Sequence, residues 1–394
     1  MEIKEAKRMN VIPFSGIRKI MEKGVELEKQ GVNVIHLEVG RPDFDTPANI
    51  KEVAKKSLDE GKVFYTSNYG IPELRKAIVK KLQQENGVTY DPDKEIIITV
   101  GLSEAIFSVL TSLLDEGDEI LVPDPVWLNY IHVPRMVGAV PVSYSLLEEN
   151  DYQLNLQEIE SKITSKTKMI AIISPNNPTG GVLGKEVLAK LAAMAIKHNL
   201  IVLSDEIYEK IIYDGNVHYS IASFPGMKER TVTLNGFSKA YSMTGWRLGY
   251  IAAPPAIINA AVRMHQYSVT CAPSIAQYAA IEALTNSEGA VTKMVTEYQR
   301  RRDYVVQAIN SIDGLSCRKP GGAFYVFVNI KKLNKPAEEV AEFLLNDAGV
   351  TLVPGTAFGE NGDGYLRLSY ANSYENLVEA CERIKKSIKK LMPQ

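Results

Sequence analysis

The sequence predicts an α/β protein with two domains: a large one with a mostly parallel sheet flanked by helices, and a smaller α+β one. Two observations lead to this prediction. Short apolar runs in the middle of the chain alternate with helical stretches, which is typical of a parallel sheet covered by helices. The length of 394 residues is enough for two domains of roughly 100 to 200 residues each.

The large domain is placed at residues 46–285. Its predicted strands cover residues 95–100, 119–122, 169–173, 201–203 and 231–234, and a helix over residues 103–114 follows the first. Each apolar run ends in a polar turn, and an open α/β sheet carries its binding residues at these carboxyl ends. We therefore expect the functional site at that edge of the sheet.

The smaller domain is placed at residues 286–394, and the N-terminal segment, residues 1–45, is assigned to it. A long charged helix is predicted over residues 288–313, followed by strands over 323–328 and 365–369 and by helices over 336–348 and 374–391. One face of the last helix is apolar, as packing against a sheet requires: Leu377, Cys381, Ile384, Ile388 and Leu391.

Composition excludes several classes of protein. Lys plus Arg number 45 against 47 Asp plus Glu, so the net charge of -2 argues against a nucleic-acid or membrane-surface protein. No apolar run approaches the ~20 residues that span a bilayer, and the charged start does not resemble a secretory signal. Three widely spaced cysteines predict a reducing, cytoplasmic location without disulfides.

Three familiar motifs are approached but not matched. Residues 180–185, GGVLGK, lack the glycine spacing of a phosphate loop and are followed by Glu186 instead of Ser or Thr. Residues 236–240, GFSKA, end in Ala240 where a nucleophile elbow needs glycine. There is no HExxH, and none of the five histidines has metal-ligand spacing, so we expect no metal.

Lys239 is a candidate nucleophile. A lone lysine is most often a solvated surface charge, but this one follows a buried strand in an apolar sequence. Poor hydration there lowers the pKa of the amine and favours its nucleophilic form. Arg247, eight residues later, would supply a fixed positive charge for a phosphate.

Several motifs together resemble the class I aminotransferases of the pyridoxal 5'-phosphate fold type I superfamily. They are SPNNPTG at 174–180, SDEIYEK at 204–210 and NGFSKAYSMTGWRLGY at 235–250. YTSNYGIPELR at 65–75 and YLRLSY at 365–370 fit the same pattern in the same order, so the resemblance covers nearly the whole chain.

The resemblance implies that Lys239 forms an exchangeable imine with the cofactor and moves the proton between the substrate Cα and the cofactor. Only a primary amine can do both. Asp205 is implied to pair with the pyridine nitrogen, so that the ring acts as an electron sink. The alternative for Asp205, taken alone, is the N-cap of a helix.

The resemblance also assigns the residues around the cofactor ring. Tyr208 and Asn177 would donate hydrogen bonds to its phenolic oxygen and thereby tune the pKa of the imine. Trp127 would stack on the ring, although a tryptophan is more often part of a core.

The cofactor phosphate is expected at the start of the helix that follows Gly101, where free N–H groups and the helix dipole favour an anion. The implied donors are Leu102, Ser103, Ser238 and Arg247. Many relatives carry a hydroxyl residue where this chain has Gly236, so one phosphate hydrogen bond is expected to be missing or replaced by water.

Tyr65 resembles a tyrosine that reaches the phosphate from the neighbouring subunit, which implies a homodimer with shared active sites. Tyr69 would be a neighbour of Tyr65 at this site, and packing in the core is an equal alternative for it.

Arg367 resembles the arginine that binds the substrate α-carboxylate as a bidentate fork. Its place inside YLRLSY agrees with this role, because a charge there is costly to bury unless it is paired. Gly40 and Asn177 are implied to contact the same substrate. An ordinary turn glycine is the alternative for Gly40.

The expected activity is transfer of the amino group of an α-amino acid to a 2-oxo acid such as 2-oxoglutarate, in a two-step ping-pong reaction. Some aspartate-specific relatives carry a lysine at the position of Ser103, so strict aspartate specificity is in doubt. A broad aspartate and aromatic specificity is the hypothesis, with an apolar lid offered by Tyr65, Tyr69 and residues 14–18. A carbon–sulfur β-lyase of the same fold and, more remotely, a non-catalytic regulator are the alternatives.

Overall fold

The computed structural model describes residues 3–392. Its α-helices are α1 (Gly16–Lys29), α2 (Ala48–Asp59), α3 (Pro72–Glu85), α4 (Gly101–Leu113), α5 (Asn129–Met136), α6 (Leu156–Ser161), α7 (Lys185–Lys197), α8 (Pro255–Ser268), α9 (Ser274–Asn286), α10 (Glu288–Asn310), α11 (Ala337–Ala348) and α12 (Tyr374–Ile388). Its strands are β1 (Ile35–His36), β2 (Ile96–Thr99), β3 (Glu119–Asp124), β4 (Val140–Ser145), β5 (Thr167–Ile173), β6 (Ile201–Asp205), β7 (Thr231–Gly236), β8 (Gly249–Ala252), β9 (Tyr325–Asn329), β10 (Val350–Thr351), β11 (Val353–Pro354) and β12 (Tyr365–Ser369).

A seven-stranded sheet forms the larger part of the molecule. Its strand order is β2-β8-β7-β6-β5-β3-β4. The neighbours from β7 to β4 pair in parallel, whereas β8 runs antiparallel to both β2 and β7. The predicted α/β class with a mostly parallel sheet is confirmed.

Two strands of this sheet, β4 and β8, are not predicted by the sequence pattern. The edge strand β4 contains Pro141 and is only partly buried, so its apolar signal is weak. Strand β8 has four residues and continues into an apolar segment that reaches α8, so periodicity does not mark it as a strand.

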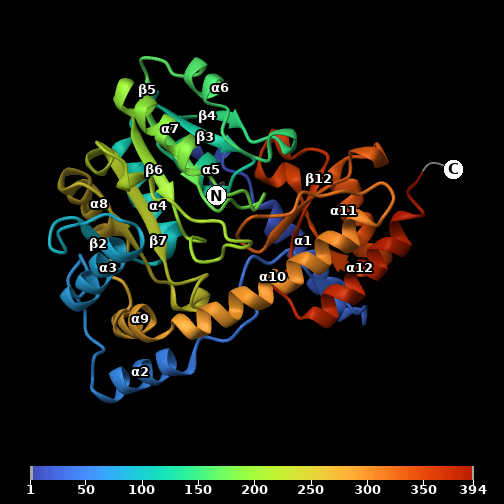
Figure 1. Cartoon of the computed structure of the whole chain (residues 1–394), viewed down its shortest axis with the longest axis horizontal. Coiled ribbons are helices and arrows are strands. Elements are labelled where there is room, and N and C mark those ends of the chain that lie inside the picture. The colour runs from blue at the N-terminus through green and yellow to red at the C-terminus, as the bar shows by residue number, and fades with distance from the viewer. Residues whose placement is uncertain (1–2, 393–394) are drawn as a thin grey trace.

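Alternate residues of the central strands face different helices. In β5, Met169, Ala171 and Ile173 pack in a core with residues of α4, α5 and α8. Ile170 and Ile172 face the other way, into a core with α7. Helices therefore cover both faces of the sheet, as Figure 1 shows.

A second, smaller sheet has the order β11-β12-β9 and is antiparallel throughout. The N-terminal strand β1 pairs in parallel with β10, and α1 lies beside these C-terminal strands in Figure 1. The final helix ends at Ile388, earlier than the predicted residue 391. The division of the chain at residues 45/46 and 285/286 stays a prediction.

Helix α10 joins the two parts of the fold. In Figure 1 it runs from α9, below the large sheet, to the C-terminal elements around α12. Val291, in its first turn, packs in the core that contains α9, whereas Val305 and Ile309 pack in the core around the small sheet.

Among residues 3–392, no helix combines the length and apolar character that crossing a bilayer requires.

Candidate active site

A cavity of about 370 Å³ lies at the carboxyl ends of β5 and β6 and beside the turn that follows β7. The structure brings eleven of the twelve predicted site residues together in its lining: Gly40, Leu102, Ser103, Trp127, Asn177, Asp205, Tyr208, Ser238, Lys239, Arg247 and Arg367. The twelfth, Tyr65, lies outside it.

Lys239 lies within this cavity, three residues after β7. Its Nζ donates a hydrogen bond to the Gly40 carbonyl and lies 5.7 Å from the ring centre of Tyr208. Burial, together with the positive charges of Arg367 and Arg247, lowers the pKa of Lys239 to about 8, against the opposing effect of Asp205. The amine is therefore deprotonated more readily than that of a solvated lysine, and its uncharged form is available as a nucleophile or base.

Asp205 is the last residue of β6 and is buried. Residues 207–210 form a turn, so the alternative that Asp205 caps a helix is wrong. Its Oδ1 accepts a hydrogen bond from the Ile207 N–H at 3.1 Å, and its Oδ2 accepts one from the Tyr130 hydroxyl at 2.8 Å. Burial raises the pKa of Asp205 to about 6, although both hydrogen bonds oppose this rise. Such a carboxylate fits a ligand that brings a cationic N–H.

Tyr130 is a site residue that the sequence reasoning missed. It lies on α5, three residues after Trp127, and its side chain is fully buried. Trp127 precedes α5, so helical spacing does not link the two residues, and the sequence pattern around Tyr130 does not distinguish it from a core residue.

Arg367 lies in the middle of β12 and is almost fully buried, with 1% of its surface exposed. Its Nη1 donates to Asn177 Oδ1 at 3.0 Å and its Nη2 donates to the Glu38 carbonyl at 2.5 Å. Its Nε is buried without a hydrogen-bond partner. Because no carboxylate neutralises this guanidinium among the described residues, the site fits an anionic ligand.

Tyr208 and Tyr325 form a pair at the same side of the cavity, with 2.8 Å between their hydroxyl oxygens. A Cβ atom at Gly40 would lie 2.3 Å from the Tyr325 hydroxyl, so close approach requires glycine there. Tyr325 was missed because, in the apolar strand β9, it cannot be distinguished from a core residue by its pattern.

The N-terminus of α4 and Arg247 make a positive corner. A Cβ atom at Gly101 would lie 2.7 Å from an Nη atom of Arg247, which places the guanidinium against the first turn of the helix. The helix dipole and this charge both favour an anion such as a phosphate. A Cβ at Gly236 would lie 2.9 Å from backbone atoms of Leu248 and Gly249, which explains the absence of a larger residue.

Tyr65 and Tyr69 lie outside the cavity. Tyr65 is 87% exposed, on the loop before α3. Tyr69 packs against the core that contains α8, and its hydroxyl lies 3.4 Å from Asn259 Oδ1.

Comparison with known proteins identifies the family. The model of the class I and II aminotransferases matches residues 32–384. The chain belongs to the class I and II aminotransferase family. Members of this family are transaminases, and so is this chain. The family in general depends on pyridoxal phosphate.

Individual relatives agree over their full length. The chain is 45% identical to an aspartate aminotransferase of Pyrococcus abyssi and 44% identical to aromatic-amino-acid aminotransferase 2 of Thermococcus litoralis, covering 97% of both chains in each case. The solved structure of an aspartate aminotransferase from Thermus thermophilus with maleate is similar to it with a TM-score of 0.93 at 40% identity, covering 98% of this chain and 100% of that chain. These relatives do not favour the β-lyase alternative.

The residues of this aminotransferase fit the family's cofactor. Within residues 3–392, the Asp205 carboxylate accepts hydrogen bonds only from Tyr130 and Ile207 and forms no ion pair, so a pyridinium N–H would give it a cationic partner, and the corner at Gly101 and Arg247 suits a phosphate. Asn177 Oδ1 is occupied by Arg367, which leaves the Nδ2 group as its free donor.

Proposed function

We propose that this aminotransferase binds pyridoxal 5'-phosphate covalently through Lys239 and transfers the amino group of aspartate and aromatic amino acids to a 2-oxo acid such as 2-oxoglutarate. The observation that carries the proposal is the buried amine of Lys239, with a pKa of about 8, in one cavity with the buried carboxylate of Asp205. The cofactor, when bound, supplies an aldehyde that accepts the amino group and a ring that accepts electrons.

The proposed roles of the side chains follow from their positions. Asp205 holds the ring nitrogen protonated. Tyr208 and Asn177 donate hydrogen bonds to the phenolic oxygen of the cofactor ring. Leu102, Ser103, Ser238 and Arg247 hold the phosphate, and Trp127 stacks on the ring.

On the substrate side, Arg367 holds the α-carboxylate, with Gly40 and Asn177 next to it. In this orientation the Lys239 amine removes the proton from the substrate Cα and later returns a proton to the product.

The donor range is supported by the composition of the cavity. Ile17, Ile106 and Trp127 provide an apolar wall that suits an aromatic side chain, while the cationic residues suit an acidic one. Both kinds of specificity occur in the names of relatives at 44–45% identity.

The test is borohydride trapping of the purified protein, combined with turnover of aspartate and phenylalanine with 2-oxoglutarate. We expect a reduced cofactor adduct on the peptide that contains Lys239. Lys239→Ala is expected to lose both the adduct and turnover, whereas Lys190→Ala, which removes an exposed lysine of α7, is expected to keep both. An adduct on another lysine, or full turnover by Lys239→Ala, would contradict the proposal.

We further propose a cytoplasmic homodimer in which Tyr65 contributes to the site of the partner subunit. Its high exposure outside the cavity and the three free cysteines support this assembly and location. Light scattering that gave the mass of a single 43.6 kDa chain at micromolar concentration would contradict the dimer.

A further inference from the structure

The charges that line the active-site cavity are strongly unbalanced. Four cationic residues, Arg41, Lys239, Arg247 and Arg367, line it together with one acidic residue, Asp205. An excess of positive charge in a cavity attracts anions and raises their local concentration. These four cationic side chains therefore determine how many anionic groups of a ligand the site can bind.

Three of the four cations have a role in the proposed function. Lys239 reacts with the cofactor, Arg247 lies at the phosphate corner, and Arg367 faces the α-carboxylate. Arg41 has no role there. Arg41 is thus the cationic residue of the cavity that remains once the cofactor and the α-carboxylate, which is common to all amino acid substrates, have been assigned.

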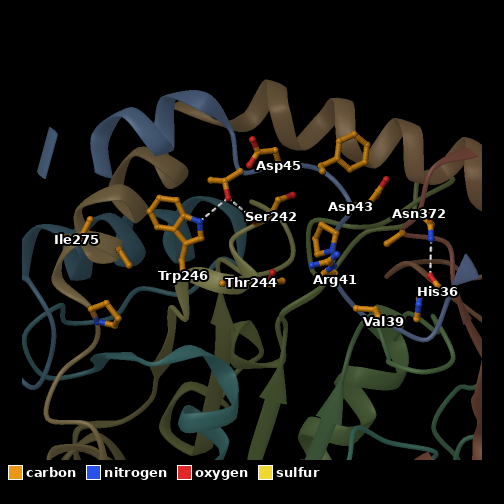
Figure 2. Close-up of a pocket in the computed structure, with 17 residues that line it drawn as sticks. His36, Val39, Arg41, Asp43, Asp45, Ser242, Thr244, Trp246, Ile275 and Asn372 are labelled. Carbon is orange, nitrogen blue, oxygen red and sulfur yellow. Dashed lines mark hydrogen bonds between the residues drawn. The ribbon is translucent and has the colours of Figure 1, made fainter. Parts of the chain in front are cut away.

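Arg41 is held at the mouth of the cavity by its neighbours in the chain. Gly40, directly before it, accepts the hydrogen bond from Lys239, and Pro42, directly after it, is buried. Arg41 also lines a second pocket next to the cavity, which Figure 2 shows. Arg41 therefore lines both the cavity that contains Lys239 and the neighbouring pocket.

The acidic residues on the same loop do not neutralise Arg41. Asp43 accepts two hydrogen bonds of 2.8 Å from Arg301, and Asp45 pairs with Lys51. Among residues 3–392, the guanidinium of Arg41 has no hydrogen bond and no ion pair, and the residue is exposed. It is free to pair with a carboxylate that a ligand brings.

We propose that Arg41 binds the side-chain carboxylate of dicarboxylic amino and 2-oxo acids and so determines the acidic branch of the specificity. This inference rests on the proposed function. A guanidinium forms a fork with a carboxylate, which gives both energy and orientation. Because Arg41 is already in contact with solvent, leaving it unpaired when an aromatic side chain is bound costs little desolvation energy.

The test is Arg41→Gln, which keeps a similar length and polarity but removes the charge. Arg263→Gln is the matched control, because Arg263 is exposed on α8 and, among the residues that the structure describes, its side chain bonds only to the Asn259 carbonyl. The measured quantity is the ratio of kcat/KM for aspartate to kcat/KM for phenylalanine, each with its oxo-acid partner. Calorimetry gives the Kd of maleate, an unreactive dicarboxylate, for each variant.

Arg41→Gln is expected to lower the aspartate-to-phenylalanine ratio by about 10- to 100-fold and to weaken maleate binding by a similar factor, since a hydrogen-bonded charge pair is lost. Arg263→Gln is expected to change neither. An unchanged ratio, an equal loss for both substrates, or unchanged maleate binding would overturn the role of Arg41. A wild-type enzyme that turns over phenylalanine but no dicarboxylate would do so too, whereas absence of all transamination would instead contradict the proposed function.

Discussion

The hydroxyl of Tyr130 donates a 2.8 Å hydrogen bond to Oδ2 of Asp205, and both side chains are buried. The two residues come from α5 and from the end of β6, so the contact joins a helix to the central sheet. The Ile207 N–H is the other donor to this carboxylate. Tyr130 therefore helps to keep Asp205 ionised at a position where burial favours the protonated acid.

Replacing Tyr130 by Phe is expected to raise the pKa of Asp205 above its value of about 6 by roughly one unit or more, because a hydrogen bond to a charged group contributes about 1.5–3 kcal/mol. Ionising Asp205 at pH 6.5 then costs more free energy, so the Kd of pyridoxal phosphate rises at that pH. The difference from wild type narrows toward pH 9, where the carboxylate is ionised in both proteins. The measurement is a fluorescence titration of the cofactor-free proteins at each pH.

Tyr144→Phe is the control for that experiment, because Tyr144 is equally buried but its hydroxyl bonds to the Ala171 carbonyl, away from Asp205. Equal cofactor affinity of Tyr130→Phe and wild type at pH 6.5 would show that the hydroxyl has no influence on Asp205.

The ion pair of Lys81 and Glu209 is expected to contribute strongly to stability. Glu209 also accepts hydrogen bonds from Asn86 at 2.8 Å and from Asn235 at 2.7 Å. Burial alone would raise the pKa of Glu209, but Lys81 and His218 hold it at about 2. Because the folded-state pKa lies below the usual 4.5, the stabilisation is complete above pH 4.5 and is lost as the pH falls toward 2.

Lys81→Met is accordingly expected to lower the free energy of unfolding at pH 7 by about 3–5 kcal/mol, since it leaves a buried carboxylate unpaired. The double variant Lys81→Met/Glu209→Gln is expected to recover part of that loss. Urea unfolding at pH 7 measures the loss in Lys81→Met and the recovery in the double variant. The same measurement at pH 4 tests whether the stabilisation begins to be lost below pH 4.5. If the double variant were as unstable as the sum of the two single variants, the two side chains would not be coupled.

Gly236→Ser introduces the hydroxyl residue that the family resemblance led us to expect at this position, but it is expected to destabilise this protein. The new Cβ would lie 2.9 Å from Gly249 Cα and from the Leu248 carbonyl oxygen, and these are backbone atoms that cannot move aside easily. Overpacking of this kind costs about 1–3 kcal/mol.

The measurement for Gly236→Ser is the melting temperature of the cofactor-free protein, with Gly245→Ser as the control, because a Cβ at Gly245 meets nothing within 4 Å. A melting temperature equal to that of wild type would mean that strands β7 and β8 separate enough to admit the side chain.

Much of the architecture was predictable from local patterns. The strands β5, β6 and β7 were expected because each is a short apolar run that ends in a polar turn, and β12 was predicted with its observed bounds. The edge strand β4 and the short strand β8 were not, because β4 is only partly buried and contains Pro141, and β8 has four residues in a longer apolar segment.

The sequence by itself determined the family and eleven of the residues that line the cavity, because these residues stand in turns and short motifs whose order the chain preserves. Only the tertiary structure revealed the contacts of Tyr130 and Tyr325 and the unpaired charge of Arg41 at the mouth of the cavity. The physical reason is that a hydrogen bond or a missing ion pair depends on which side chains from distant segments meet. That is decided by how the helices and the two sheets pack.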